Sequence, residues 1–455
     1  MSSPLSVSRR IALDAFVEVM EKHSTPEEAT EKLYNKFSNI SRQDKNFVKE
    51  LLYGSLRWYG KLYWILQHTA KRDLSKSSPE IRAALVLGAY QIYYMSKVPD
   101  RAAVNESVEF IRNSGQAAAC SFVNGILRQI SRRAEYFAKP DKEKRPAEYL
   151  SVQFSYPQWM VERWLKQFRF DQLVTMLPLN NSIPPNTIRI NGLKVSQEAQ
   201  ADLLKDLLRL EKNHIEKRPL RNCFQLSSSP DFSEESLFSK GLFTVQDESA
   251  QLIAHLVNPQ NGENIVDICA GPGGKLGHLY ELSEGKANLT AVEINPAQIV
   301  RLKESMARLG HSRFEVFESN LFDWKPAVPQ DKVLLDAPCS GFGVLRRHPE
   351  GKWLKTEKLV TEMQAKQREM LKHCVSLLKK SGELIYSVCS HEIEETAQQL
   401  NWLMQTFPNE LEVISAASRL PPYYKQFVTR QNILLVYSGN SEGMDGFGAF
   451  IVKRV

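Results

Sequence analysis

The sequence has few cysteines and none of the spacings typical of a disulfide framework or a zinc site. Its 455 residues include six cysteines, and no two of these form a C-x-x-C pair. Six are too few for a disulfide framework in a chain this long, and without C-x-x-C pairs neither a zinc ribbon nor thioredoxin-type chemistry is expected. We therefore expect reduced thiols, a cytoplasmic protein and no bound metal.

Long apolar runs and a targeting segment are also lacking. No stretch approaches the ~18 consecutive apolar residues that a membrane helix requires. The first residues, MSSPLSVSRRIALDAFVEVM, contain no apolar segment followed by a small-residue cleavage site. We expect no membrane partner, and the net charge of +7 permits a polyanionic one without requiring it.

The residue pattern of the chain changes twice along its length. At roughly 150 residues per domain, the length also fits about three domains. Residues 1–137 carry apolar side chains at helical spacing and predict an all-α domain. Residues 138–240 begin with a charged linker, with a boundary near Pro140, and continue as a small α+β module. In residues 241–455 short apolar runs alternate with helix-length segments, which predicts a doubly wound α/β domain with its function at the carboxyl ends of parallel strands.

A glycine-rich loop in the sequence DICAGPGGK follows the first of these strands. Its glycines, Gly271, Gly273 and Gly274, allow a backbone to approach a ligand closely and tolerate positive φ. Leu276 follows the lysine where a phosphate-binding P-loop would carry serine or threonine. A purely structural strand-to-helix turn is the alternative interpretation of the loop alone.

Two later strand ends extend this pattern. Glu293 ends the next strand about 20 residues on, where a carboxylate can accept both ribose hydroxyls of a nucleoside cofactor. Asn320 and Asp323 follow the third strand and offer contacts to an adenine amino group. A loop, an acid and a third contact on successive strands suit S-adenosylmethionine better than a nucleotide.

Two cysteine–serine pairs end two further strands. Cys339 lies in LLDAPCSGFGV, and Cys389 lies 50 positions later in LIYSVCSHEIEE. Burial as structural thiols is the usual fate of free cysteines, and we interpret Cys120, Cys223 and Cys374 in that way. Basic residues follow Cys339, and we expect their charge to favour a thiolate: Arg346, Arg347, His348 and Lys352.

A thiolate beside a methyl-sulfonium donor suits methylation at C5 of a pyrimidine. Addition of the thiolate at C6 makes C5 nucleophilic, and an acid such as Asp336, holding N3, would stabilise the developing charge. A second thiol could assist the elimination. The base must leave its stack, which calls for single-stranded or extruded RNA. An exocyclic-amine methyltransferase would carry an Asn/Asp-Pro-Pro-aromatic turn, whereas this turn reads DAPCS.

Over nearly its whole length the chain resembles the bacterial 16S ribosomal RNA cytosine-C5 methyltransferase B family, the Sun or Fmu proteins. The resemblance lies in FTVQDESAQL, DICAGPGGK, LLDAPCSGFGVLRRHPEGKW, YSVCSHEIEE and the terminal MDGFGAFIVKR. The N-terminal DKNFVKELLYGSLRWYGKLYWIL, IRAALVLGAYQIYYMSKVP and SFVNGILRQI resemble a NusB-like RNA-binding domain.

The resemblance implies a Rossmann-like methyltransferase domain that uses S-adenosylmethionine, preceded by the α+β module and the NusB-like domain. It implies that Cys389 is the nucleophile at C6 and that Cys339 helps to release the product. The substrate would be one cytosine of 16S rRNA, naked or partly assembled, and we expect a monomer. The implied cofactor-lining positions are Cys269, Ala270, Gly271, Pro272, Gly273, Gly274, Lys275, Glu293, Asn320 and Asp336.

Three positions depart from the family pattern: Val388 stands for threonine, Asn320 for aspartate and Leu276 for a small hydroxyl residue. Two alternatives stay open, namely an RNA-binding ribosome-assembly factor with weak or lost activity and a methyltransferase that acts on transfer RNA. Basic residues of the N-terminal domain are candidate phosphate contacts: Arg57, Arg82, Arg128, Arg132 and Arg133.

Overall fold

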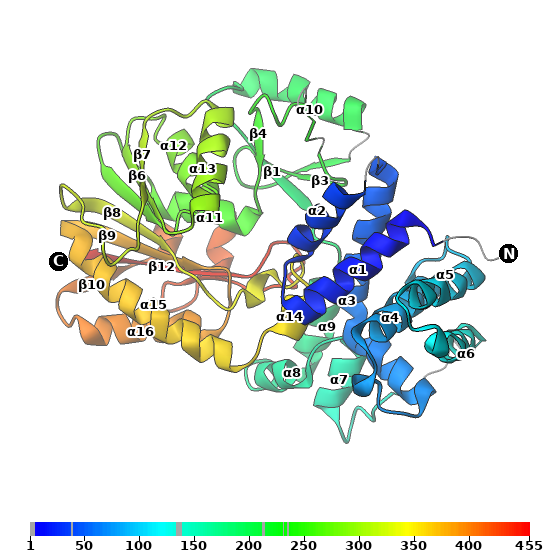
Figure 1. Ribbon diagram of the computed structural model, residues 1–455. Coiled ribbons are helices and arrows are strands. Elements are labelled where there is room, and N and C mark those ends of the chain that lie inside the picture. The colour runs from blue at the N-terminus through cyan, green and yellow to red at the C-terminus, as the bar shows by residue number, and fades with distance from the viewer. Residues whose placement is uncertain (1–4, 38–39, 133–138, 212–213, 231, 234–235) are drawn as a thin grey trace. The chain divides into compact units, whose positions relative to one another are not determined.

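The computed structural model describes residues 5–37, 40–132, 139–211, 214–230, 232–233 and 236–455 (Figure 1). These fold as two compact units. The first comprises Met1–Asn181 and Leu345–Glu357, and the second comprises Ser182–Val344 and Lys358–Val455. Residues 345–357, part of the motif that follows Cys339, therefore belong to the first unit, although the chain before and after them belongs to the second.

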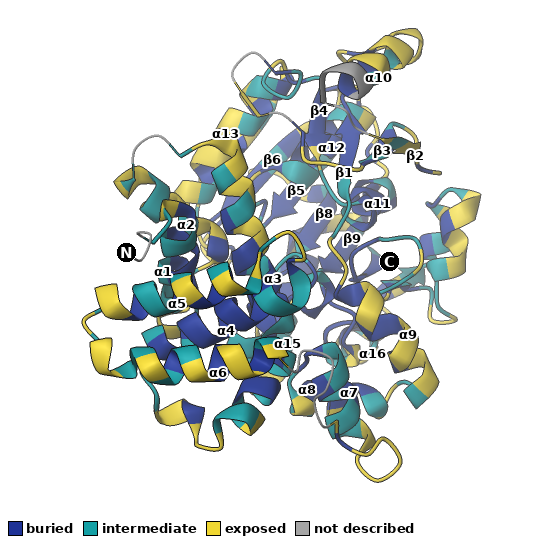
Figure 2. Ribbon diagram, turned by 90° about the vertical axis from the view of Figure 1, so that its right-hand side faces the viewer, coloured by how far each residue is buried: buried dark blue, intermediate teal, exposed yellow. Residues whose placement is uncertain are grey.

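The described part of the first unit is helical, which confirms the predicted all-α, NusB-like domain. At its centre α4 (Pro79–Tyr94) is buried on nearly every side, since all of residues 81–91 except Arg82 are buried. Figure 2 shows α5 and α6 beside it with exposed outer faces. The other helices are α1 (Val7–Lys22), α2 (Pro26–Lys36), α3 (Arg42–Ala70), α5 (Asp100–Asn113), α6 (Cys120–Arg132), α7 (Pro146–Phe154), α8 (Gln158–Leu165), α9 (Phe170–Asn180) and α14 (Gly351–Leu354).

The charged segment expected as a linker ends earlier than its composition indicates. Helix α7 begins at Pro146, within that segment, because a proline at the first helical position loses no hydrogen bond. Helices α7 to α9 belong to the first compact unit, whereas the sequence grouped residues 138–240 together. The division into domains at 137/138 and 240/241 stays a prediction.

The second unit opens with a small antiparallel sheet in the order β2-β3-β1-β4. Its strands are β1 (Asn186–Ile190), β2 (Ile215–Lys217), β3 (Cys223–Leu226) and β4 (Phe243–Val245), with α10 (Gln197–Glu211) between β1 and β2. Ile188, Phe224 and Phe243 form its core together with Leu203 and Leu207 of α10. This arrangement confirms the predicted α+β module.

The larger sheet has the order β10-β12-β9-β8-β5-β6-β7, with β11 paired to β12. Strands β7, β6, β5, β8 and β9 are parallel, and β12 joins β9 in antiparallel register. The strands are β5 (Asn264–Ile268), β6 (Asn288–Glu293), β7 (Phe314–Glu318), β8 (Gln330–Asp336), β9 (Leu378–Val388), β10 (Leu411–Ile414), β11 (Leu434–Val436) and β12 (Phe447–Arg454).

Helices cover both faces of this sheet, as Figure 1 shows. Successive strand residues alternate between two cores: Ile265 packs in the core with α11 to α13, and Val266 packs in the core with α15 and α16. The helices are α11 (Glu248–Val257), α12 (Gly274–Leu282), α13 (Pro296–Leu309), α15 (Lys358–Leu377) and α16 (Ala397–Thr406). The predicted doubly wound domain is confirmed. Because β5, β6, β8 and β9 are parallel, their carboxyl ends all lie at the same end of the sheet, which is called the sheet edge below.

In the part of the chain that the structure describes, no helix combines the length and apolar content needed to cross a membrane. The described residues likewise hold no group of three or more His, Cys, Asp or Glu side chains arranged to bind a metal ion.

Candidate active site

The glycine-rich loop joins β5 to α12 with several residues in the left-handed region. Cys269 has φ of 60°, and Gly271 and Gly273 have φ of 51° and 83°. At Gly273 a Cβ atom would lie 2.9 Å from Leu302 Cγ, so this position needs glycine for space as well as for conformation. Leu276, which departs from the family pattern, is buried in the core beneath the loop.

Glu293 connects this loop to the end of β6. Its Oε2 accepts a hydrogen bond from the Gly271 amide at 2.9 Å, and its Oε1 accepts one from the Asn295 amide at 2.9 Å. Both oxygens keep a further lone pair, because a carboxylate offers about four acceptor positions. The carboxylate is therefore fixed in orientation at the place where the sequence puts a ribose contact.

Asn320 and Asp323 follow β7 and are exposed. The Asn320 side-chain oxygen accepts from the Phe322 amide at 3.1 Å, and its carbonyl accepts from the Asp323 amide at 3.1 Å. The Asn320 amide nitrogen takes no part in these bonds.

Asp336 ends β8 and forms the polar centre of the site. Its Oδ2 accepts from Lys275 Nζ at 2.5 Å, and its Oδ1 accepts from Ser387 Oγ at 2.7 Å. Lys275 comes from the glycine loop and Ser387 from β9, so one carboxylate joins three strand ends. Despite its burial, the pKa of Lys275 is raised, and the charges of Asp336, Asp267 and Cys389 are among the causes.

The two cysteines lie together at this edge. Cys339 Sγ and Cys389 Sγ are 3.2 Å apart, and neither cysteine is in a disulfide. The hydrogen bond with Cys389 and burial raise the pKa of Cys339 well above its usual range. When two thiols share a proton in this way, ionisation of one opposes ionisation of the other.

The expectation that the basic residues after Cys339 favour its thiolate was wrong, because the pKa of that thiol is raised. Lys352 belongs to the first compact unit, where its ammonium nitrogen donates to Arg57 O, Ser155 O and Asn181 Oδ1. Lys275, which the sequence assigned only to the cofactor, interacts electrostatically with Cys389. The sequence did not indicate this interaction, because Lys275 follows β5 and Cys389 follows β9, which are far apart in the chain.

Asp267 was missed by the sequence analysis. It lies in β5 and is fully buried, and within the described structure neither of its carboxyl oxygens has a hydrogen-bond partner. Burial, followed by the charge of Asp336, raises the pKa of Asp267 to about 8. An acid inside the otherwise apolar strand NIVDI was the available signal.

The remaining cysteines lie apart from these contacts, as expected. Cys223 and Cys374 are buried, and burial raises the pKa of each thiol. Cys120 is half-buried in the first unit, and its Sγ donates to Val108 O at 3.6 Å. Val388, the family departure before Cys389, is buried in the sheet core.

Two of the N-terminal arginines are engaged inside the first unit. Arg57 is buried and donates to Arg346 O at 3.0 Å, so it cannot contact phosphate. Arg82 donates to Ser77 O at 2.6 Å and to Glu21 Oε1 at 2.5 Å. Arg128 and Arg132 are exposed, and Arg133 lies outside the described residues.

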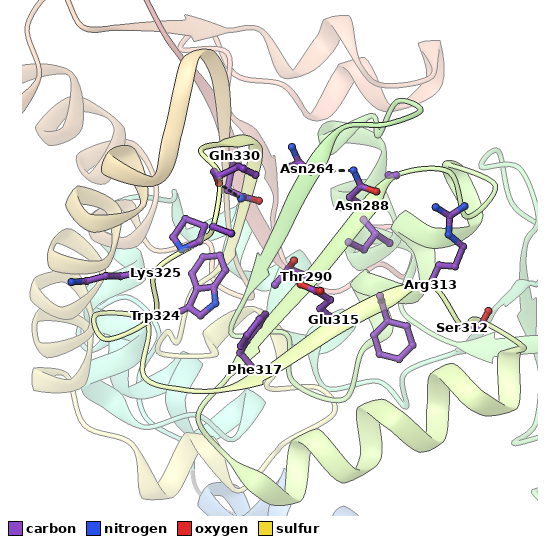
Figure 3. Close-up of a pocket in the computed structure, with 16 residues that line it drawn as sticks. Asn264, Asn288, Thr290, Ser312, Arg313, Glu315, Phe317, Trp324, Lys325 and Gln330 are labelled. Carbon is purple, nitrogen blue, oxygen red and sulfur yellow. Dashed lines mark hydrogen bonds between the residues drawn. The ribbon is translucent and has the colours of Figure 1, made fainter.

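A cavity of the second unit lies elsewhere. It has a volume of about 530 Å³ and is lined by the first residues of several strands, among them Asn264 of β5, Asn288 of β6 and Gln330 of β8. Figure 3 shows Trp324, Phe317 and Arg313 around it. These are the amino ends of the strands, whereas the residues singled out from the sequence lie at the carboxyl ends.

Comparison with known proteins agrees with this geometry. The family model described as 16S rRNA methyltransferase RsmB/F matches residues 254–451, the NusB family model matches residues 6–132, and the ferredoxin-like domain model of RsmF/B-like methyltransferases matches residues 156–220. The Bacillus subtilis (strain 168) protein named "Probable ribosomal RNA small subunit methyltransferase B" is 31% identical over 452 residues, covering 96% of this chain and 97% of the relative.

Solved structures share the fold. PH0851 has a TM-score of 0.80 at 22% identity and covers 99% of both chains. NSun6 from Pyrococcus horikoshii, crystallised with SFG, has a TM-score of 0.55 at 18% identity over 65% of this chain and 97% of that one. With these family models and a relative that matches nearly the full length of both chains in agreement, the chain belongs to the RsmB/F family of 16S rRNA methyltransferases.

Proposed function

We propose that the protein transfers a methyl group from S-adenosylmethionine to C5 of one cytosine in 16S rRNA, with Cys389 as the nucleophile at C6. The observation that carries the proposal is the Cys339–Cys389 pair, with sulfur atoms 3.2 Å apart, at the sheet edge that also holds the glycine loop. Lys275 connects the two, because it comes from the loop, pairs with Asp336 and interacts with Cys389.

The glycine loop and Glu293 fit the cofactor. Positive φ at Gly271 and Gly273 exposes backbone to a ligand, and the Glu293 carboxylate is held for a ribose diol by two amides. Cys269, Ala270, Pro272, Gly274 and Asn320 would complete the lining. When bound, S-adenosylmethionine supplies an electrophilic methyl group. The crystallisation of NSun6 with SFG, an analogue of that cofactor, supports this assignment.

Cys389 attacks first in this mechanism. Its thiolate forms a bond to C6, and the electron pair of the C5–C6 double bond moves toward C5, which becomes nucleophilic. N3 of cytosine accepts hydrogen bonds, so Asp336 would bind it as the protonated acid, and a proton passed from Lys275 across their contact would stabilise the negative charge that develops on the ring. The ammonium of Lys275 favours the Cys389 thiolate.

Cys339 acts in the second half. After C5 has been methylated, its proton must leave and the Cys389–C6 bond must break to restore the aromatic ring. Cys339 is the thiol next to the leaving sulfur and retains its proton, because its pKa is raised. It is therefore placed to give its proton to the Cys389 sulfur as the S–C6 bond breaks, and the proton lost from C5 restores the Cys339 thiol.

The RNA substrate follows from the relatives and from chemistry. A base stacked in a helix cannot reach the half-buried thiol pair, so the target must be extruded or single-stranded. We propose naked or partly assembled 16S rRNA, a monomeric enzyme and a cytoplasmic setting. Exposed Arg128 and Arg132 remain candidate phosphate contacts of the NusB-like domain. Neutralising both should flatten the salt dependence of RNA affinity.

Bisulfite sequencing of 16S rRNA free of ribosomal proteins, with and without the enzyme, tests the reaction and the substrate together. One newly protected cytosine is the expected result. Tight RNA binding without a protected cytosine would favour the assembly-factor function, and protection only in transfer RNA would move the substrate to that class.

Cysteine variants test the two thiol assignments separately. Cys389→Ser should abolish turnover, because the nucleophile is lost. Cys339→Ala should accumulate a covalent protein–RNA adduct, visible as a slow band on a denaturing gel. The same band with Cys389→Ala instead would reverse the two roles.

A further inference from the structure

The two cysteines are each followed by a serine, and the serines pair as the cysteines do. Ser340 Oγ and Ser390 Oγ are 3.3 Å apart, and both serines are fully buried. The hydroxyl contact therefore lies directly behind the 3.2 Å thiol contact and belongs to the same two turns. Contacts that hold Ser340 and Ser390 in place therefore also hold the neighbouring Cys339 and Cys389, and so limit the distance between the two sulfur atoms.

A buried carboxylate holds one of these turns from behind. Glu395 is 0% exposed and accepts from Ser340 N at 2.7 Å and from Ser340 Oγ at 2.5 Å. Gln367 Nε2 donates to Glu395 Oε1 at 3.0 Å and also to Pro338 O at 2.9 Å. The residues on both sides of Cys339 are thus tied to one carboxylate and one amide.

The same segment carries the other cysteine. Glu395 follows Cys389 by six positions in CSHEIEE, and Tyr386 of β9 donates its hydroxyl to Glu395 O at 3.0 Å. Gln399 Nε2 donates to Gln367 Oε1 at 2.8 Å and supports the network from α16. Glu395 therefore links the turn of Cys339 to the strand and turn that carry Cys389.

Burying a carboxylate costs free energy unless the group is well hydrogen-bonded, so Glu395 depends on these contacts. Its charge also has a neighbour to act on. After the Cys389 hydrogen bond and burial, the charges of Cys389 and Glu395 are the further causes that raise the pKa of Cys339. Lys275, in contrast, interacts with Cys389. The two thiols thus have electrostatic neighbours of opposite sign.

We propose that Glu395 is a positioning residue that fixes the turn of Cys339 and, through it, the separation of the two thiols and the greater reactivity of Cys389. This inference rests on the proposed function for the meaning of the two roles, and it deepens that function by naming what assigns them. Glu395 touches neither the base nor the cofactor in this scheme and acts through Cys339 and Ser340.

The test is competitive alkylation of the two thiols, measured on the full-length protein without RNA or cofactor. Limiting iodoacetamide is added across a pH series, and peptide mass spectrometry gives the fraction modified at Cys389 and at Cys339. Alkylation follows the thiolate fraction. In the wild-type protein Cys389 should react first, and Cys339 reacting first would overturn the proposal without any variant.

Glu395→Gln removes the charge and keeps the shape. The ratio of Cys389 to Cys339 modification should fall by about tenfold, and Cys339 should become reactive at lower pH. Glu395→Asp, which keeps the charge, should retain more of the wild-type ratio. Methyl transfer by Glu395→Gln should lose kcat with little change in KM for RNA.

Glu248→Gln is the matched control, because Glu248 is also 0% exposed and its carboxylate is bonded to Arg218 and Tyr424. It should lower the melting temperature and leave the alkylation ratio unmoved. A Glu395→Gln protein that behaves like this control would overturn the proposal. Because the alkylation needs neither RNA nor S-adenosylmethionine, its outcome is independent of whether the proposed methylation is found.

Discussion

Two lysines, a half-buried one in the second compact unit and a fully buried one in the first, show how surroundings decide what an ammonium group does. Lys275 of the second unit pairs with the Asp336 carboxylate at 2.5 Å, and its pKa is raised. Lys352 of the first unit is 1% exposed, and burial lowers its pKa well below the usual range, with Arg57 as a further cause. The same side chain is thus an electrostatic partner in one place and a hydrogen-bond donor in the other.

The contacts of Lys352 explain its structural role. Its Nζ donates to Arg57 O at 2.7 Å, to Ser155 O at 2.8 Å and to Asn181 Oδ1 at 3.0 Å, and it lies 4.4 Å from the centre of the Tyr156 ring. These oxygens come from α3, from the end of α7 and from the end of α9. One nitrogen therefore anchors the inserted segment among three helices of the first unit.

The difference teaches that a basic residue in a catalytic motif is not automatically catalytic. Both lysines lie in motifs by which the chain resembles its family, DICAGPGGK and HPEGKW. Carboxylates and a thiol surround the first, so its charge can act on chemistry. Neutral oxygens surround the second, so its donors satisfy buried backbone.

The largest expected difference between substitutions of the two lysines is in the rate of methyl transfer. Lys275→Met should slow methyl transfer by about 10²–10⁴-fold, because Asp336 loses its cation and Cys389 loses the charge that favours its thiolate. Single-turnover transfer of labelled methyl groups to RNA measures this. Lys352→Met is the control, and an equal loss in both variants would break the comparison.

The second effect is on stability and falls on the other lysine. Lys352→Met leaves three buried oxygens without their donor, and an unsatisfied buried group costs roughly 1–3 kcal/mol. We expect a lower free energy of unfolding in urea, with a clearly smaller loss in Lys275→Met. Stability unchanged in Lys352→Met would show that water replaces its hydrogen bonds.

A pH series sharpens the comparison at Asp267, beside Lys275. The folded pKa is about 8, above the ordinary 3.8, so between these values the folded protein binds a proton that the unfolded chain does not. The stability that this group contributes is therefore present at low pH and falls as pH rises to about 8. Asp267→Asn should gain stability over the wild type progressively across that window.

Urea unfolding at several pH values measures this gain. The extra stability of Asp267→Asn should level off above pH 8, because Asp267 has then lost its proton in both the folded and the unfolded wild-type protein. An advantage that is constant across the series would mean that Asp267 does not titrate in this range.

The smallest expected effect concerns His255, a half-buried base whose charged neighbour is a cation. Burial, followed by the charge of Arg189, lowers the pKa of His255 from 6.5 to about 4. Between these values the unfolded chain binds the extra proton, so stability is complete above 6.5 and is lost as pH falls toward 4. His255→Gln should weaken that acid sensitivity in urea unfolding, and an unchanged acid limb would exclude His255 as a cause.

Much of the fold was accessible from pattern alone. The alternation of apolar runs and helical segments predicted β5, β6, β8 and β9 and placed Glu293, Asp336 and Cys389 at their ends. Parallel strands end at one edge, so these side chains could be predicted to meet. The antiparallel pairing of β12 beside β9 was not predicted, because strand order is not a local property.

The misses share a physical cause. Arg57 looked like a phosphate contact, and Lys352 looked like a partner of the thiols, because a charge in sequence is assumed to be solvated. Asp267 was passed over inside an apolar strand, and Glu395 was one acid among several in HEIEE. Burial and partners give these four residues their roles, and neither is encoded by spacing.

By itself the sequence determined the chemistry that is available: two cysteine–serine turns, a glycine loop and the acids that follow the strands. Residue identity and local periodicity were enough, because each motif is completed within a few positions. Only the tertiary structure decided which charge acts on which thiol, since three separate segments meet there: the glycine loop with Lys275, DAPCS with Asp336 and Cys339, and CSHEIEE with Cys389 and Glu395. Their electrostatic coupling depends on distance and burial, and both arise only when the strands of the sheet are assembled.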